Sequence, residues 1–159
     1  MDRTRPYAIA LLLFLLCAGC ERDATGPHLE ATPGTARDSV MSLSNAARAQ
    51  AGMAPLAGDD RLHEVASAHA RDMAVRGYFS HITPEGRTLA HRLRDAGVSY
   101  RAAGENIAGN ASAAGAVEAW LTSDGHRRNI LDPSFGRLGV GVHREANSPF
   151  TYYVQVFTN

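Results

Sequence analysis

The chain has 159 residues, and its sixteen basic residues balance sixteen acidic ones, so the formal net charge is zero. Once residues 1–19 are set aside, fourteen arginines face fifteen acidic residues, a balance that argues against a nucleic-acid-binding groove. We therefore expect no nucleic acid among the partners of this protein.

The first twenty residues have the pattern of an export signal. Arg3 and Arg5 precede an apolar run, residues 8–16, which is too short to span a bilayer as a stable helix. The run ends in Leu-Cys-Ala-Gly-Cys, which resembles a bacterial lipoprotein cleavage box with Cys20 as the acylated residue. We predict a signal peptide at residues 1–19 and an exported protein, lipid-anchored at the cell envelope, in the outer membrane if the cell has one. An ordinary secretory signal and a secreted protein are the alternative.

Residues 20–37 are predicted to be the lipidated cysteine and a flexible tether. They are rich in Thr, Pro, Gly, Ala and charge, and Leu29 is their only bulky apolar residue, so they cannot bury a core. The folded part is then residues 38–159, the common size of one domain. Cys17 leaves with the signal, so the exported chain keeps one cysteine and forms no internal disulfide.

Four helices are predicted from apolar spacing and cap residues. The first follows a possible Asp38 cap and ends before Gly52. The second starts at Asp59 or Asp60 and ends at Gly77, with His69 on its apolar stripe. The third and fourth cover about residues 88–96 and 113–123.

The last third of the domain changes to a period of two. Residues 138–142 and 152–157 alternate as strands do, and the turn residues between them predict an antiparallel hairpin. A further strand is predicted near residues 98–101. Helices followed by a hairpin indicate the α+β class.

Four segments resemble the CAP superfamily, which comprises cysteine-rich secretory proteins, antigen 5 and pathogenesis-related 1 proteins. They are His69-Ala-Arg-Asp-Met73, Gly77-Tyr-Phe-Ser-His81, Gly104-Glu-Asn-Ile-Ala108 and the run from Trp120 to Leu131. The similarity spans essentially all of residues 38–159 and is nearest to short bacterial members without disulfides. The resemblance implies a CAP (SCP) domain, a three-layer α-β-α sandwich with a small antiparallel sheet.

The resemblance also implies a cleft. His81 matches the family's first cleft histidine, Glu105 its acidic residue and His126 its second histidine. The family's further glutamate does not carry over, because Ser123, followed by Asp124, stands in its place. His81 and His126 with Glu105 are the residue types that hold a divalent ion such as Zn²⁺ and leave positions open to water.

Each of these residues also has a plainer interpretation. His81 would bond the backbone in its turn, His126 would start a helix, and Glu105 would be buried support. His69 is expected to be a hydrogen-bonded core residue. The spacing after His63 and Glu64 does not match a zincin motif, and Ser80 lacks the turn of a serine hydrolase.

The sequence therefore favours a non-enzymatic binding module, anchored through Cys20, whose cleft engages a lipid or envelope ligand. The alternative is a metal-dependent, peptidase-like hydrolase in which an ion at His81 and His126 activates water and Glu105 is the catalytic base. A third possibility is a purely structural domain, in which the two histidines affect stability alone.

Overall fold

The computed structural model describes residues 33–146 and 148–159. The elements, in chain order, are α1 (Pro33–Gln50), β1 (Ala57–Gly58), α2 (Asp60–Arg76), α3 (Leu89–Asp95), β2 (Ala103–Asn110), α4 (Ala113–Thr122), α5 (Asp124–Ile130), β3 (Arg137–His143) and β4 (Thr151–Thr158). The predicted signal peptide, Cys20 and the tether as far as residue 32 lie outside the described residues. Within the described part, no helix is long and apolar enough to cross a membrane.

The four strands form one sheet in the order β1-β3-β4-β2. The predicted hairpin is confirmed, since β3 and β4 pair antiparallel with Leu138 opposite Phe157. β2 pairs antiparallel with the other side of β4, and the two-residue β1 runs parallel to β3. The sheet is therefore mixed rather than antiparallel throughout, because the chain adds a short strand along β3 before it enters α2.

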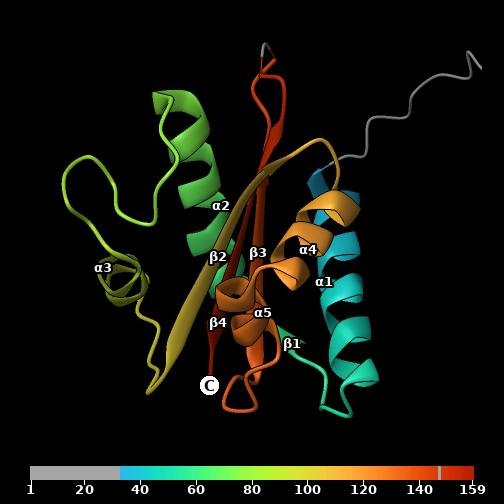
Figure 1. Ribbon diagram of the computed structural model, residues 1–159. Helices are drawn as coiled ribbons and strands as arrows, with labels where there is room; N and C mark the ends of the chain where they lie inside the picture. The colour runs from blue at the N-terminus through green and yellow to red at the C-terminus, as the bar shows by residue number, and fades with distance from the viewer. Residues whose placement is uncertain (1–32, 147) are drawn as a thin grey trace, which may run out of the picture. The chain divides into compact units, whose positions relative to one another are not determined.

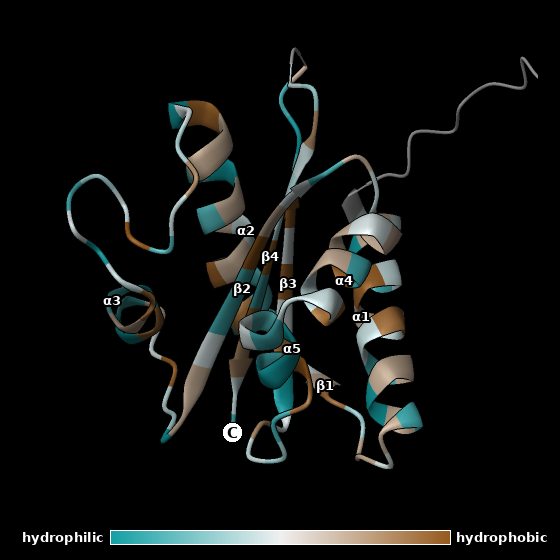
Figure 2. Ribbon diagram, in the orientation of Figure 1, coloured by the Kyte–Doolittle hydropathy of each residue, from teal (hydrophilic) through white to brown (hydrophobic). Residues whose placement is uncertain are grey.

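Helices cover both faces of the sheet, so the predicted three-layer α-β-α sandwich is confirmed (Figure 1). β4 separates two cores: Tyr152, Val154 and Val156 pack with α2 and α3, whereas Tyr153 and Phe157 pack with α1, α4 and α5. All eight residues of β4 are buried. In Figure 2 hydrophobic residues follow the central strands, as this double burial requires.

The predicted caps of the second helix are confirmed, and the third helix has an N-terminal cap that was not predicted. The Asp59 side chain accepts a hydrogen bond from the Leu62 N–H at 3.1 Å, and Gly77 ends α2 with φ 69°. At α3, the N–H of Thr88 donates to Nδ1 of His91 at 3.2 Å. Helices α2, α3 and α4 thus lie where the sequence predicts them.

Three local predictions differ from the structure. α1 begins at Pro33, not after Asp38, because Ala36 as well as Val40 is buried against the core. A proline at the first helical position costs no hydrogen bond. The helix therefore includes residues 33–37 of the predicted tether.

The strand predicted near residues 98–101 is wrong, because the N–H of Val98 bonds the carbonyl of Leu93 and closes α3. The neighbouring strand is β2, which contains the Gly-Glu-Asn segment. This segment lacks the β-branched residues that usually indicate a strand. α5 was also not predicted, since its seven residues hold a single buried apolar residue, Ile130.

α2 lies unusually close to β3 because two positions of the strand are glycine. A Cβ atom at Gly139 would lie 2.1 Å from the carbonyl carbon of Leu62, and one at Gly141 would lie 2.2 Å from that of Ala66. Backbone atoms cannot move aside as a flexible side chain can. The separation of these two layers therefore requires glycine at both positions.

We expect Gly141→Ala to lower the free energy of unfolding by about 2 kcal/mol or more, because its methyl group overlaps the α2 backbone. Urea unfolding followed by circular dichroism measures this. Gly136→Ala is the matched control, since no atom lies within 4 Å of its added Cβ. Equal stability of the two variants would contradict the close packing of α2 on β3.

Candidate functional site

Two of the three predicted cleft residues are in direct contact. His81 lies in the loop after α2, Glu105 lies on β2, and Nδ1 of His81 is 2.8 Å from Oε1 of Glu105. The Glu105 side chain is only 3% exposed, whereas that of His81 is 51% exposed. A carboxylate only accepts hydrogen bonds, so His81 carries its proton on Nδ1 when neutral. The Nε2 lone pair of His81 is then left for a ligand.

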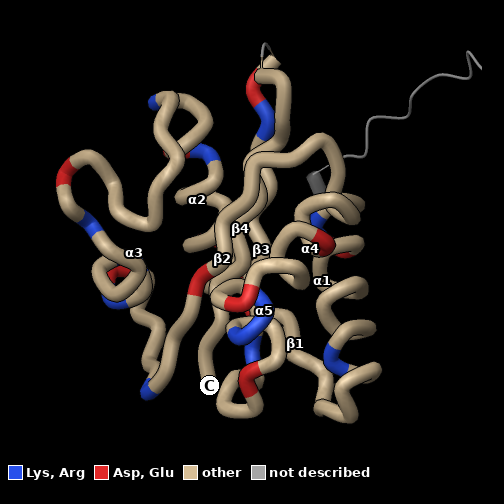
Figure 3. The backbone as a smooth tube through the Cα atoms, in the orientation of Figure 1, with Lys and Arg blue, Asp and Glu red and all other residues tan. Residues whose placement is uncertain are grey.

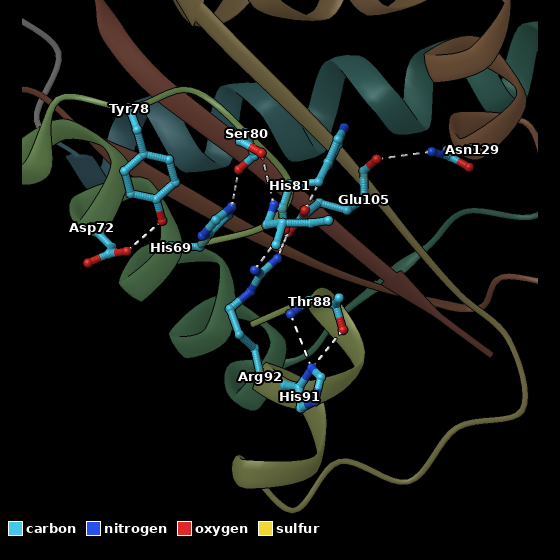
Figure 4. Close-up of polar contacts among 11 residues, drawn as sticks. His69, Asp72, Tyr78, Ser80, His81, Thr88, His91, Arg92, Glu105 and Asn129 are labelled. Carbon is cyan, nitrogen blue, oxygen red and sulfur yellow. Dashed lines mark hydrogen bonds and ion pairs between the residues drawn. The ribbon is translucent and has the colours of Figure 1, made fainter. Parts of the chain in front are cut away.

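The second oxygen of Glu105 is bound by an arginine that sequence analysis did not single out. Arg92, on α3, donates from Nη2 to Oε2 of Glu105 at 2.5 Å and from Nη1 to the carbonyl oxygen of His81 at 3.0 Å (Figure 4). The Arg92 side chain is almost buried. The one available signal was its place on the apolar side of α3, beside Leu89 and Leu93.

These contacts favour the supporting interpretation of Glu105. Both of its oxygens accept hydrogen bonds from cationic or imidazole donors, so neither faces the cleft as a free acceptor. A buried carboxylate needs such partners, because an unpaired charge in the interior is costly. In return, the Glu105 carboxylate accepts a hydrogen bond from Nδ1 of His81 and so fixes the tautomer of that imidazole.

The loop that carries His81 is held at several points. Nε2 of His69 donates to the carbonyl oxygen of Ser80 at 3.0 Å, directly before His81. Arg76 and Glu85 form an ion pair farther along the loop. His69 itself is buried, so its predicted core position agrees with the structure.

His126 lies on α5, with its Nδ1 2.9 Å from the hydroxyl oxygen of Ser123. Burial lowers the pKa of His126, and the positive charge that His81 can carry lowers it further. Ser123 supports the ring, while Asp124 is exposed in the first turn of α5.

A chain of buried amides sets the position of α5 against the sheet. Nδ2 of Asn106 donates to the carbonyl oxygen of His126 at 3.1 Å and to Oε1 of Gln155 at 3.0 Å. Asn129 donates to Oδ1 of Asn106 at 2.8 Å, and Gln155 continues the chain to Ser44 on α1. His126 is thereby tied through its backbone to β2, β4 and α1.

The expected three-ligand metal set does not fit this arrangement. Residues 33–146 and 148–159 contain no group of three or more His, Cys, Asp or Glu side chains that could hold a metal ion. Glu105 is engaged by Arg92 and His81, which leaves two imidazoles. Surface hollows of about 490 and 390 Å³ exist, but neither is lined by His81 or His126.

Known proteins share the sequence pattern and the fold of this chain. The model of the cysteine-rich secretory protein family (CAP) matches residues 41–157. The chain is 40% identical over 156 residues to the uncharacterized membrane protein YlbC and 42% identical over 103 residues to the uncharacterized protein YkwD, both of Bacillus subtilis. These alignments cover 98% and 64% of this chain but only 42% and 40% of the two relatives. The chain thus spans well under half the length of either relative.

A solved structure shows the same fold. It is an extracellular protein containing an SCP domain from Bacillus anthracis, with a TM-score of 0.73 and 34% sequence identity. The match covers 85% of this chain and 45% of that one.

Arg92→Leu should lower the free energy of unfolding by about 3–5 kcal/mol, because it leaves the Glu105 carboxylate buried without its cation. Adding Glu105→Gln should restore part of the loss, since the charge is then removed. Arg94→Leu, on an exposed position of the same helix, is the matched control and should change stability by less than about 0.5 kcal/mol. Urea unfolding of the parent protein, of Arg92→Leu and Glu105→Gln, and of their double variant measures the coupling, and simple additivity would refute it.

Stability should also decrease in mild acid. Burial lowers the pKa of His69, while nearby Glu105 opposes that shift and Arg92 adds to it. The unfolded chain then takes up a proton near pH 6.5 that the folded chain takes up only at lower pH. The contribution of His69 to the free energy of unfolding is fully present above about pH 6.5. It is lost as the pH falls toward the pKa of His69 in the folded state. Urea unfolding over this range should show a flatter profile for His69→Gln, and an unchanged profile would assign the acid sensitivity elsewhere.

Proposed function

This chain belongs to the cysteine-rich secretory protein (CAP) family, and we propose that it is an exported, envelope-anchored binding module without catalytic activity. The names of its relatives support the location, since one is a membrane protein and another is extracellular. The predicted signal and lipidation at Cys20 would supply the anchor.

This proposal rests on one observation: both carboxylate oxygens of Glu105 already accept hydrogen bonds from the protein. A general base must accept a proton from a positioned water molecule or substrate group. Both oxygens of Glu105 already accept hydrogen bonds, from His81 and from Arg92. Ser123 stands where a second carboxylate would otherwise support water activation. The metal-dependent hydrolase therefore has less support than the binding module.

The chemistry of the site suits a ligand that donates hydrogen bonds. His81 offers the lone pair of Nε2, and burial favours the neutral form of His126. A lipid headgroup or envelope polymer with hydroxyl or amino groups would meet these acceptors. Two imidazoles alone would bind a divalent ion such as Zn²⁺ only weakly.

Zn²⁺ titration by calorimetry separates the two functions. We expect binding that saturates only in large excess of the ion and disappears in the His81→Ala/His126→Ala double variant. Glu105→Gln should keep whatever binding exists, because Glu105 is not a ligand in this geometry.

Tight one-to-one Zn²⁺ binding together with peptide or envelope-polymer hydrolysis that Glu105→Gln abolishes would establish the hydrolase instead. If the double variant changed only the unfolding free energy, and neither Zn²⁺ nor envelope extracts bound the parent protein, the domain would be purely structural.

A further inference from the structure

Exposed apolar side chains gather where the β3–β4 hairpin turns. Phe79 is 53% exposed and Val75 is 58% exposed, although both are large apolar residues. The ring of Tyr152 lies 6.3 Å from that of Phe79 and 5.0 Å from that of the half-buried Phe150. We call the group Val75, Phe79, Phe150 and Tyr152 the aromatic end. Figure 2 shows hydrophobic colour at the free end of α2, where Val75 lies.

α2 brings its C-terminus to this end of the domain. Leu62 lies against Gly139 and Ala66 against Gly141, so α2 runs in the same direction as β3 and ends beyond it. Phe79 follows shortly after the helix, and Phe150 precedes the first residue of β4. The aromatic end is thus formed by the C-terminal side of α2 together with the hairpin.

α1 begins at the same end. Near its C-terminus, Arg48 donates to the carbonyl oxygens of Ile130 and Asp132, shortly before β3 starts. Ser44 meets Gln155 in the middle of β4. The first turn of α1 must then lie toward the hairpin, as Figure 1 shows. The chain therefore enters the domain at its aromatic end.

The chain between Cys20 and the start of α1 is short. Thirteen residue steps separate Cys20 from Pro33, which span at most about 45 Å when fully extended. An anchored domain is thus held close to the bilayer by the end that carries Phe79. A tether of this length raises the local concentration to the millimolar range, so even a small apolar patch can engage the surface.

We propose that the aromatic end rests on the lipid bilayer, with Phe79 and Phe150 entering the interfacial region where aromatic rings are favoured. This inference rests on the anchoring through Cys20 proposed above. The loop that follows α2 carries both Phe79 and His81, and His81 bonds Glu105, which pairs with Val156 farther from the hairpin turn, so the candidate site would lie above the bilayer surface.

The charges at this end favour an apolar contact over an electrostatic one. Arg76 pairs with Glu85 and Asp72, and Arg144 is followed directly by Glu145. In the view of Figure 3, a basic stretch and an acidic stretch lie next to each other in the hairpin. The contact should therefore persist in salt, unlike one made by a basic patch.

The test uses the mature chain from Cys20, whose single thiol can be coupled to a maleimide lipid in phosphatidylethanolamine and phosphatidylglycerol vesicles with brominated acyl chains. Phe79→Trp places a fluorophore at the aromatic end, and Trp120 is buried and serves as the constant background. Tyr100→Trp is the matched control. Tyr100 is also exposed and lies at the opposite end, shortly before Ala103, which pairs with Thr158.

We expect a blue shift and a loss of the added emission in Phe79→Trp, and neither change in Tyr100→Trp. Equal quenching of the two variants, or quenching of neither, would overturn the proposal. Quenching of neither is the result expected if the aromatic end binds a protein or a glycan instead. Mass spectrometry of the protein from its own cells tests lipidation of Cys20 separately. A failure of anchoring can therefore be distinguished from a failure of docking.

Discussion

The buried carboxylate of Glu105 is the constraint on which the candidate site depends. A charge in the interior must be paired, and here the partners come from the loop after α2 and from α3. The backbone carbonyl of the same residue accepts a hydrogen bond from Asn129 on α5 at 3.2 Å. One residue of β2 therefore contacts three segments: the loop after α2, α3 and α5. Arg92 completes the arrangement because it holds both the carboxylate and the backbone of His81.

The rest of the domain provides a rigid support for this arrangement without disulfides. Glycines 139 and 141 let α2 approach the sheet on one face, while the Asn106, Gln155 and Ser44 amide and hydroxyl chain joins the layers through the other. The edge strand β2 is also protected: Nε1 of Trp120 donates to the carbonyl oxygen of Ile107 at 3.0 Å. Side chains thus satisfy the edge that would otherwise be free to pair with another chain.

This support is the physical basis of the proposed binding role. Glu105 orients an imidazole and stabilises a loop, and both tasks require that its oxygens stay occupied. The two imidazoles remain the groups that can meet a ligand. The loop that carries His81 also carries Phe79, whose ring lies 6.3 Å from that of Tyr152, so one loop contributes to both the site and the aromatic end.

Local sequence patterns determined much of this protein. The caps of α2, the period of β3 and β4, and the motifs around His81, Glu105 and His126 were sufficient for the layers and the family. The tertiary structure alone decided that the Gly-Glu-Asn segment is a strand and that Glu105 is paired with Arg92. Those contacts join residues 13 and 24 positions apart, across elements whose relative placement depends on packing. Periodicity reports which face of an element is buried, but not which distant side chain will neutralise a buried charge.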